Sequence, residues 1–270
     1  MNYPNVMKKV FAIFFLFFIF SACGSYQRIL KSPDLKLKYD AALKFYDDAN
    51  YYKALPLFEE LITSLRGTAN AEKVYYYYAY SQFHTEQYEL ASYHFQNLVN
   101  TFPHSTYAEE CQFMVAFCYY NDSPESSLDQ SSTYRAINEL QAFINKYPNS
   151  GKKDQCNQLI DMLREKLELK GFNAGSLYYN MGNYNAAQVS FKNLIHDFPN
   201  TKYKEDCMFM SFKAAYEYAA NSIEEKKAER FKSAKEYFIS FSESFPQSSK
   251  MKEALNLYEN VKKQSEMPIN

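Results

Sequence analysis

The sequence predicts an all-α fold, and composition together with internal repetition leads to that expectation. Only 6 of the 270 residues are glycine, too few for many tight hairpins, phosphate-cradling loops or strand bulges. Hydrophobic residues make up 47% of the chain and charged residues 23%, so the chain can bury a core and lacks the composition of a disordered segment. Similar segments also recur along the chain, which is typical of stacked helical repeats.

The first 22 residues have the features of a secretory signal peptide. Lys8 and Lys9 precede an apolar run from Val10 to Phe20, which is too short to cross a bilayer as a helix. The sequence FSAC that ends this run resembles the lipobox of bacterial lipoproteins, although Phe20 stands where Leu is usual. We therefore expect cleavage after Ala22 and acylation (palmitate) of Cys23, followed by a tether over residues 23–35. An ordinary cleaved signal with an incidental Cys is the alternative, and Met7 is an alternative start to Met1.

A pattern of alanine, an apolar residue four positions later, and a terminal aromatic–proline pair recurs through the rest of the chain. An earlier copy, Ala54 with Phe58, lacks the proline. The segment YAEECQFMVA from Tyr107 also recurs as YKEDCMFMSF from Tyr203. The complete copies are Ala91/Phe95/Phe102-Pro103, Ala136/Leu140/Tyr147-Pro148, Ala187/Phe191/Phe198-Pro199 and Ala234/Phe238/Phe245-Pro246.

This pattern resembles the tetratricopeptide repeat, a helix–turn–helix unit. In such a unit the alanine lets the two helices approach, the aromatic ring fills the space between repeats, and proline ends the second helix. We expect a superhelix of five repeats and a polar C-terminal capping helix over 249–264. The repeats begin near Lys36, Glu72, Glu109, Lys170 and Lys204.

The repeats form two predicted groups. Repeats one to three occupy residues 36–150, and residues 151–270 hold a connecting helix (152–170), repeats four and five, and the capping helix. Residues 121–132 and 221–228 are expected to interrupt the third and fifth repeats between their helices. The stripe of Leu159, Leu163 and Leu167 on the connecting helix is expected to be core rather than a partner-binding zipper.

Several classes of function are disfavoured by the sequence. With 30 basic and 31 acidic residues there is no basic field for nucleic acid. No phosphate-binding loop, dinucleotide fingerprint, nucleophile elbow or zinc-protease motif occurs, and the four histidines are dispersed. We therefore expect no enzyme activity, no cofactor and no metal. The mature cysteines lack zinc or redox spacing and are expected to be small buried residues: Cys111, Cys118, Cys156 and Cys207.

The first helices of the repeats carry aromatic residues at the positions that face the concave side of such a superhelix. Rings with a polar tip suit an extended apolar peptide, so we expect a substrate-peptide groove, although the same rings could equally be core between repeats. The lysine and asparagine that clamp a terminal carboxylate in chaperone adaptors are absent. The groove candidates are Tyr39, Tyr46, Tyr76, Tyr80, Phe83, Phe113, Phe117 and Tyr120.

With the lipobox, these repeats resemble the BamD-type lipoproteins of the outer-membrane β-barrel assembly machinery, most specifically in SPESSLDQSSTYRAINELQAFINKYPNS. The resemblance implies lipid anchoring in the outer membrane facing the periplasm and reception of unfolded outer-membrane proteins by the N-terminal repeats. It also implies docking of the C-terminal repeats on the periplasmic domains of the barrel-forming subunit. The residues it suggests for that interface are Tyr203, Glu205, Lys213, Glu217 and Arg230.

Two other functions remain open at this stage. One is a different periplasmic tetratricopeptide lipoprotein that acts as a scaffold for envelope complexes. The other is a surface glycan-binding lipoprotein, which the absence of tryptophan disfavours, since such proteins usually stack sugars on that residue.

Overall fold

The computed structural model describes residues 25–68 and 70–265, and within these ranges every regular element is a helix. The signal segment and Cys23 lie outside the described residues. After a helical stretch over 25–30, the helices are α2 (Leu35–Asp47), α3 (Tyr51–Ser64), α4 (Ala71–His84), α5 (Tyr88–Thr101), α6 (Ala108–Asp122), α7 (Ser131–Lys146), α8 (Lys153–Asn180), α9 (Tyr184–Asp197), α10 (Lys204–Ala220), α11 (Glu224–Ser244) and α12 (Met251–Ser265). None of these helices is both long and apolar enough to cross a membrane.

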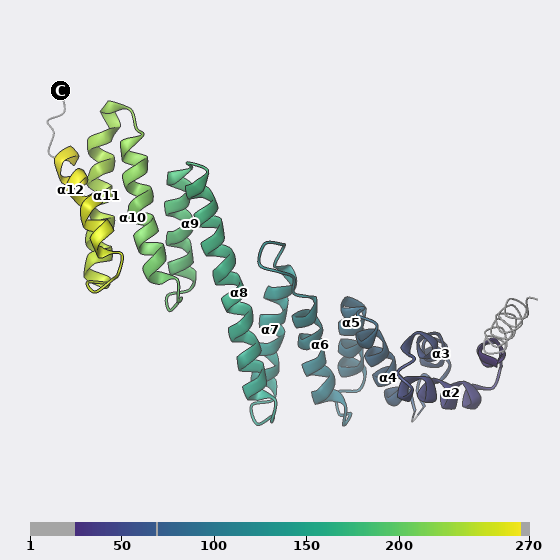
Figure 1. Ribbon diagram of the computed structural model, residues 1–270. Helices are drawn as coiled ribbons and strands as arrows, with labels where there is room; N and C mark the ends of the chain where they lie inside the picture. The colour runs from purple at the N-terminus through teal and green to yellow at the C-terminus, as the bar shows by residue number, and fades with distance from the viewer. Residues whose placement is uncertain (1–24, 69, 266–270) are drawn as a thin grey trace, which may run out of the picture. The chain divides into compact units, whose positions relative to one another are not determined.

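The helices form two compact units, each of which we describe by itself. One unit runs to Ser123 and resumes over Ser131–Leu159, and the other comprises Pro124–Gln130 and the residues from Ile160 onward. In the first unit, α2 packs on α3, α4 on α5 and α6 on α7. In the second, α9 packs on α10, α10 on α11 and α11 on α12, as the ribbon shows (Figure 1). The all-α class and the repeated hairpins are confirmed.

The turn inside a hairpin has the same construction in three repeats. One residue adopts a left-handed conformation, with φ of 55° at Ala49, 61° at Glu86 and 76° at Gly182. The amide of the next residue then donates back across the helix end, which is the hydrogen bond of a Schellman motif. These bonds run from Asn50 to the Phe45 carbonyl (2.7 Å), from Gln87 to Gln82 (3.0 Å) and from Asn183 to Tyr178 (2.9 Å).

The core contains the residues that the repeat pattern selected. The five pattern alanines have no exposed surface, nor do the apolar residues four positions later in the first four copies. Phe238, the fifth, is 6% exposed. Leu159, Leu163 and Leu167 are buried as predicted, and so are the four described cysteines, which are free thiols. Burial raises the pKa of Cys111 and of Cys207 to about 12, so these thiols are poor nucleophiles.

The boundaries of α8 and α11 differ from the sequence prediction. Residues 152–170 were expected as a separate connecting helix, but α8 continues without a break through Asn180. Its Gly175 lies where an added Cβ would sit 2.6 Å from the ring of Phe191, so the glycine serves close packing on α9 and does not end the helix. Residues 221–228 were expected to interrupt the fifth repeat, yet Glu224 already begins α11, where two acidic residues favour a helix N-terminus.

The predicted insertion over 121–132 is shorter in the structure, a loop over 123–130 between α6 and α7. Within the second unit, the ammonium of Lys170 on α8 donates to the carbonyls of Ser126 (3.2 Å) and Leu128 (2.8 Å) in this loop. The side-chain amide of Gln130 closes the loop on itself through the carbonyl of Glu125 at 2.8 Å. The loop is therefore held by a charged donor rather than by an apolar contact.

Candidate partner-binding surfaces

A serine or threonine two positions after the proline of each aromatic–proline pair is joined to the preceding repeat hairpin. Its hydroxyl donates to a glutamate in the first helix of that hairpin and accepts the backbone N–H two residues further on. We call this pair of bonds the clasp. The four clasps are Ser105–Glu72 (2.7 Å), Ser150–Glu109 (2.6 Å), Thr201–Glu168 (2.8 Å) and Ser248–Glu205 (2.6 Å). The N–H donors are those of Tyr107, Lys152, Tyr203 and Lys250.

In three of the four clasps, the residue that donates this N–H also contacts an aromatic ring of the preceding hairpin. Tyr107 packs on Tyr76, with ring centroids 4.4 Å apart, and the ammonium of Lys152 lies 4.6 Å from the ring centroid of Phe113. Phe113 is only 4% exposed. The sequence left groove and core open for this residue, and its burial assigns it to the core.

Five other rings of the first unit form a continuous series across three helices. Measured between ring centroids, Tyr46 of α2 lies 6.1 Å from His84, and His84 lies 5.6 Å from Phe83 of α4. The Phe83 ring in turn lies 5.8 Å from that of Phe117 of α6, which lies 5.7 Å from that of Tyr120. We call these five residues the aromatic row. Its four Tyr and Phe side chains are partly buried, so each keeps some accessible surface, and His84 is exposed.

Tyr80 contacts the row through His84, with ring centroids 6.1 Å apart, and Tyr76 contacts Tyr80 at 4.7 Å. The hydroxyl of Tyr80 donates to Glu110 at 2.7 Å, and the other oxygen of that carboxylate pairs with Lys152 at 3.3 Å. Burial, followed by this hydrogen bond, raises the pKa of Tyr80, which therefore stays a neutral donor. Tyr39 is partly buried and stands outside the ring contacts, beside Lys73, whose pKa it raises.

His84 was not among the sequence candidates. Its ring stacks on that of Tyr51, with centroids 4.4 Å apart and planes 14° apart, and partial desolvation of this otherwise exposed side chain lowers its pKa. The ring is therefore neutral near pH 7 and adds a flat face to the row. The sequence did contain an indication of this role, because His84 directly follows the groove candidate Phe83 at the end of the first helix of its repeat.

The residues suggested for partner docking in the second unit all make contacts within the chain. Lys213 pairs with Glu253 at 2.7 Å, and the guanidinium of Arg230 lies 4.0 Å from the ring centroid of Tyr218. The backbone carbonyl of Glu217 accepts a hydrogen bond from the side-chain amide of Asn221. Glu205 belongs to a clasp, and the ring of Tyr203 stacks on that of Phe172. Their role at an interface stays a prediction, and substitutions of Lys213 or Arg230 would also disturb the fold.

Metal coordination has no candidate in residues 25–68 and 70–265, where no three His, Cys, Asp or Glu side chains are grouped to hold an ion.

Comparison with known proteins decides the family. The model of the family described as YfiO, outer membrane lipoprotein, matches residues 33–230, which is most of the chain. The chain belongs to this family. The match spans both units and every clasp except Ser248–Glu205, whose serine lies beyond it.

Relatives of this YfiO-family chain include two curated proteins. The outer membrane protein assembly factor BamD of Caulobacter vibrioides is 23% identical over 181 residues, covering 67% of this chain and 59% of that protein. BamD of Rickettsia prowazekii is 23% identical over 171 residues, covering 63% of this chain and 68% of that protein. The chain thus spans less than two thirds of the Caulobacter protein. A solved tetratricopeptide-repeat protein from Bacteroides fragilis is 16% identical, with 86% of this chain and 99% of that chain covered and a TM-score of 0.42.

Proposed function

We propose that this protein is an outer-membrane lipoprotein subunit of a β-barrel assembly machinery. The observation that carries the proposal is the YfiO family match over residues 33–230, supported by relatives named as assembly factors of outer membrane proteins. In this role Cys23 carries the acyl chains, and the described helices face the periplasm. Several buried acyl chains give stable anchoring, whereas a single chain binds a membrane only reversibly.

The first unit receives unfolded outer-membrane proteins in this proposal. Nascent barrel strands alternate apolar and polar residues, and the aromatic row offers ring faces for the apolar ones. Its members Tyr46, Phe83 and Tyr120 lie in the last turns of α2, α4 and α6, so the row repeats at the spacing of the hairpins. Tyrosine hydroxyls and His84 add polar atoms that can bond the free edge of an extended strand.

The second unit docks on the periplasmic domains of the barrel-forming subunit. The Lys213–Glu253 pair supplies charges at its surface, since the two side chains are 26% and 55% exposed. An interface of this kind combines aromatic anchors with charges at the rim. Because both residues also hold α12, the interface should be probed with exposed residues that have no role in the fold.

Depletion in the native host tests the proposal. Loss of the chain should lower the amount of folded β-barrel proteins in the outer membrane, and re-expression should restore it. Cys23→Ala should leave the protein unprocessed or soluble and should restore the barrels poorly. Unchanged barrel levels on depletion would contradict the proposal and favour a scaffold for other envelope complexes, and binding on a glycan array would favour a glycan-binding lipoprotein.

A further inference from the structure

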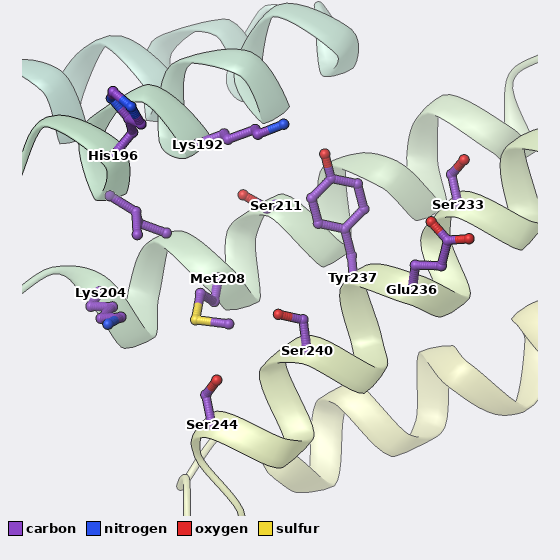
Figure 2. Close-up of a pocket in the computed structure, with 11 residues that line it drawn as sticks. Lys192, His196, Lys204, Met208, Ser211, Ser233, Glu236, Tyr237, Ser240 and Ser244 are labelled. Carbon is purple, nitrogen blue, oxygen red and sulfur yellow. The ribbon is translucent and has the colours of Figure 1, made fainter. Parts of the chain in front are cut away.

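The second unit contains a pocket that the proposed function does not use. It has a volume of about 610 Å³ and lies between α9, α10 and α11. Figure 2 shows the side chains of Lys192, Tyr237 and Ser240 directed into the space between these helices. Its size falls in the range of about 300–1,000 Å³ that is usual for ligand sites.

Hydroxyl groups dominate the wall that α11 contributes. Ser233, Tyr237, Ser240 and Ser244 follow one another at helical spacing along one face, and Ser211 of α10 adds a hydroxyl at the floor. Burial raises the pKa of Tyr237, so its hydroxyl remains a donor at neutral pH. The side chains of Ile195 and Met208 supply the apolar part of the lining. The pocket therefore combines several hydroxyl donors with a lining that is more apolar than polar.

The charged residues of the pocket are mostly positive. Lys192 of α9 and Lys204 of α10 line it, and no ion pair or hydrogen bond of either ammonium group is found among the described residues. Glu236 is the one carboxylate in the lining of this pocket, and His196 is paired with its neighbour Asp197 at 3.0 Å. A ligand with carboxylates would thus meet two free cations as well as the hydroxyl donors.

The shape of the site is elongated. A second pocket of about 340 Å³ shares Ser233 and Tyr237 with the first and continues past Gln188 and Arg230. Along α11, the distance from Ser233 to Ser244 is about 16 Å at about 1.5 Å per residue, the length of about five residues of extended chain. A free inorganic anion would fill little of such a groove.

None of the five residues suggested for the barrel-forming subunit lines the larger pocket, although Arg230 lines the second one. Ser211 faces the pocket, and Lys213 stands two residues later, about 200° around the helix axis of α10. Lys213 contacts Glu253 and the rings of Phe209 and Tyr179 instead. The two sides of α10 can therefore be altered separately.

We propose that the groove between α9 and α11 binds an extended acidic segment of a protein partner, with carboxylates at alternate positions near Lys192 and Lys204. Alternate residues of an extended chain point to the same side, so such carboxylates would lie on the face of the peptide that is turned toward the groove. The serine and tyrosine hydroxyls bond the peptide backbone, and Ile195 with Met208 packs against its Cβ atoms. This site is independent of the aromatic row, which lies in the other unit.

Fluorescence anisotropy with a synthetic peptide tests the proposal. The probe is a labelled peptide of about nine residues with aspartate at alternate positions, and its asparagine counterpart serves as the neutral comparison. We expect the acidic peptide to bind at least about tenfold more tightly than the neutral one, with affinity falling as salt is raised. Equal affinity for the two peptides, or no binding to either at low salt, would overturn the proposal.

Variants of the whole chain locate the site. Lys192→Glu with Lys204→Glu should weaken acidic-peptide binding at least about tenfold, using about 1.4 kcal/mol per decade. The matched control is Lys232→Glu with Lys235→Glu, which changes the net charge equally at exposed positions of α11 outside the pocket lining. An uncharged test, Ser240→Leu, should also weaken binding by obstructing the groove. Equal loss in the lysine control, or full affinity in the pocket variants with unchanged melting, would contradict the assignment.

Discussion

The hydroxyl of Ser248 donates to a carboxylate oxygen of Glu205 at 2.6 Å, although 43 residues separate the two in the chain. The same bond recurs at Ser105–Glu72, Ser150–Glu109 and Thr201–Glu168. Each joins the loop that leaves one hairpin to the first helix of that hairpin, and the loop is thereby fixed where the next helix begins. The clasp is a polar counterpart of the alanine–aromatic packing that builds the hairpins.

The Thr201 clasp can be tested for its contribution to stability. Thr201 is 6% exposed, and its hydroxyl both donates to Glu168 and accepts the N–H of Tyr203. Thr201→Val keeps the shape but leaves these groups without their partner, so we expect a loss of about 1–3 kcal/mol in unfolding free energy by denaturation. Thr201→Ser, which keeps the hydroxyl, should lose much less. A larger loss in Thr201→Ser than in Thr201→Val would show that the methyl group contributes more than the clasp.

The Ser248–Glu205 clasp makes stability depend on pH in a defined direction. The hydrogen bond from Ser248 lowers the pKa of Glu205, with a further contribution from Lys250. A carboxyl group with a lowered pKa in the folded state stabilises the protein above its unfolded pKa and loses that contribution as the pH falls through the folded value. The melting temperature of Ser248→Ala should therefore be lower than that of the wild type at pH 7, and the difference should shrink toward pH 3. A constant difference would contradict this.

An ion pair between a buried lysine and a half-exposed glutamate in the first unit gives a further prediction. The ammonium of Lys38 is 4% exposed and bonds both carboxylate oxygens of Glu60, which is 43% exposed. Glu60→Ala removes the partner of a buried charge and should cost about 1–3 kcal/mol, measured by denaturant unfolding. Adding Lys38→Met to that variant should recover most of the loss. If the double variant were less stable than Glu60→Ala, the lysine would contribute through its packing rather than its charge.

Substitutions of the α6 rings should separate core from binding surface. Phe113→Ala should cost about 3–5 kcal/mol of stability because the side chain is buried beneath Lys152. Phe117→Ala with Tyr120→Ala should change melting less and should weaken binding of an aromatic-terminated strand peptide roughly five- to a hundred-fold. Melting curves and anisotropy on the same samples check both. Full peptide affinity in a stable double variant would exclude the aromatic row as the binding surface.

The hairpins could be predicted from the sequence because their decisive contacts are local. Ala91 and Phe95 lie one turn apart on the same helix, so the period of the pattern places them on one buried face. The clasp could not be predicted this way, since its members are 33 to 43 residues apart and serine is common in loops. Phe113 and Phe117 share one periodicity as well, and contacts of Phe113 with residues distant in the sequence, Phe143 and Lys152, distinguish the buried ring from the accessible one.

The central claim is that unfolded outer-membrane proteins contact the aromatic row during their assembly. Site-specific photo-crosslinking tests it most directly, with a photoreactive phenylalanine analogue at Tyr120 in the native host and a control at exposed Lys232. During pulsed synthesis of a barrel protein, Tyr120 should give a transient crosslink to that protein which decays as the barrel folds, and Lys232 should give none. The absence of a crosslink at Tyr120, with the variant still supporting assembly, would contradict the account.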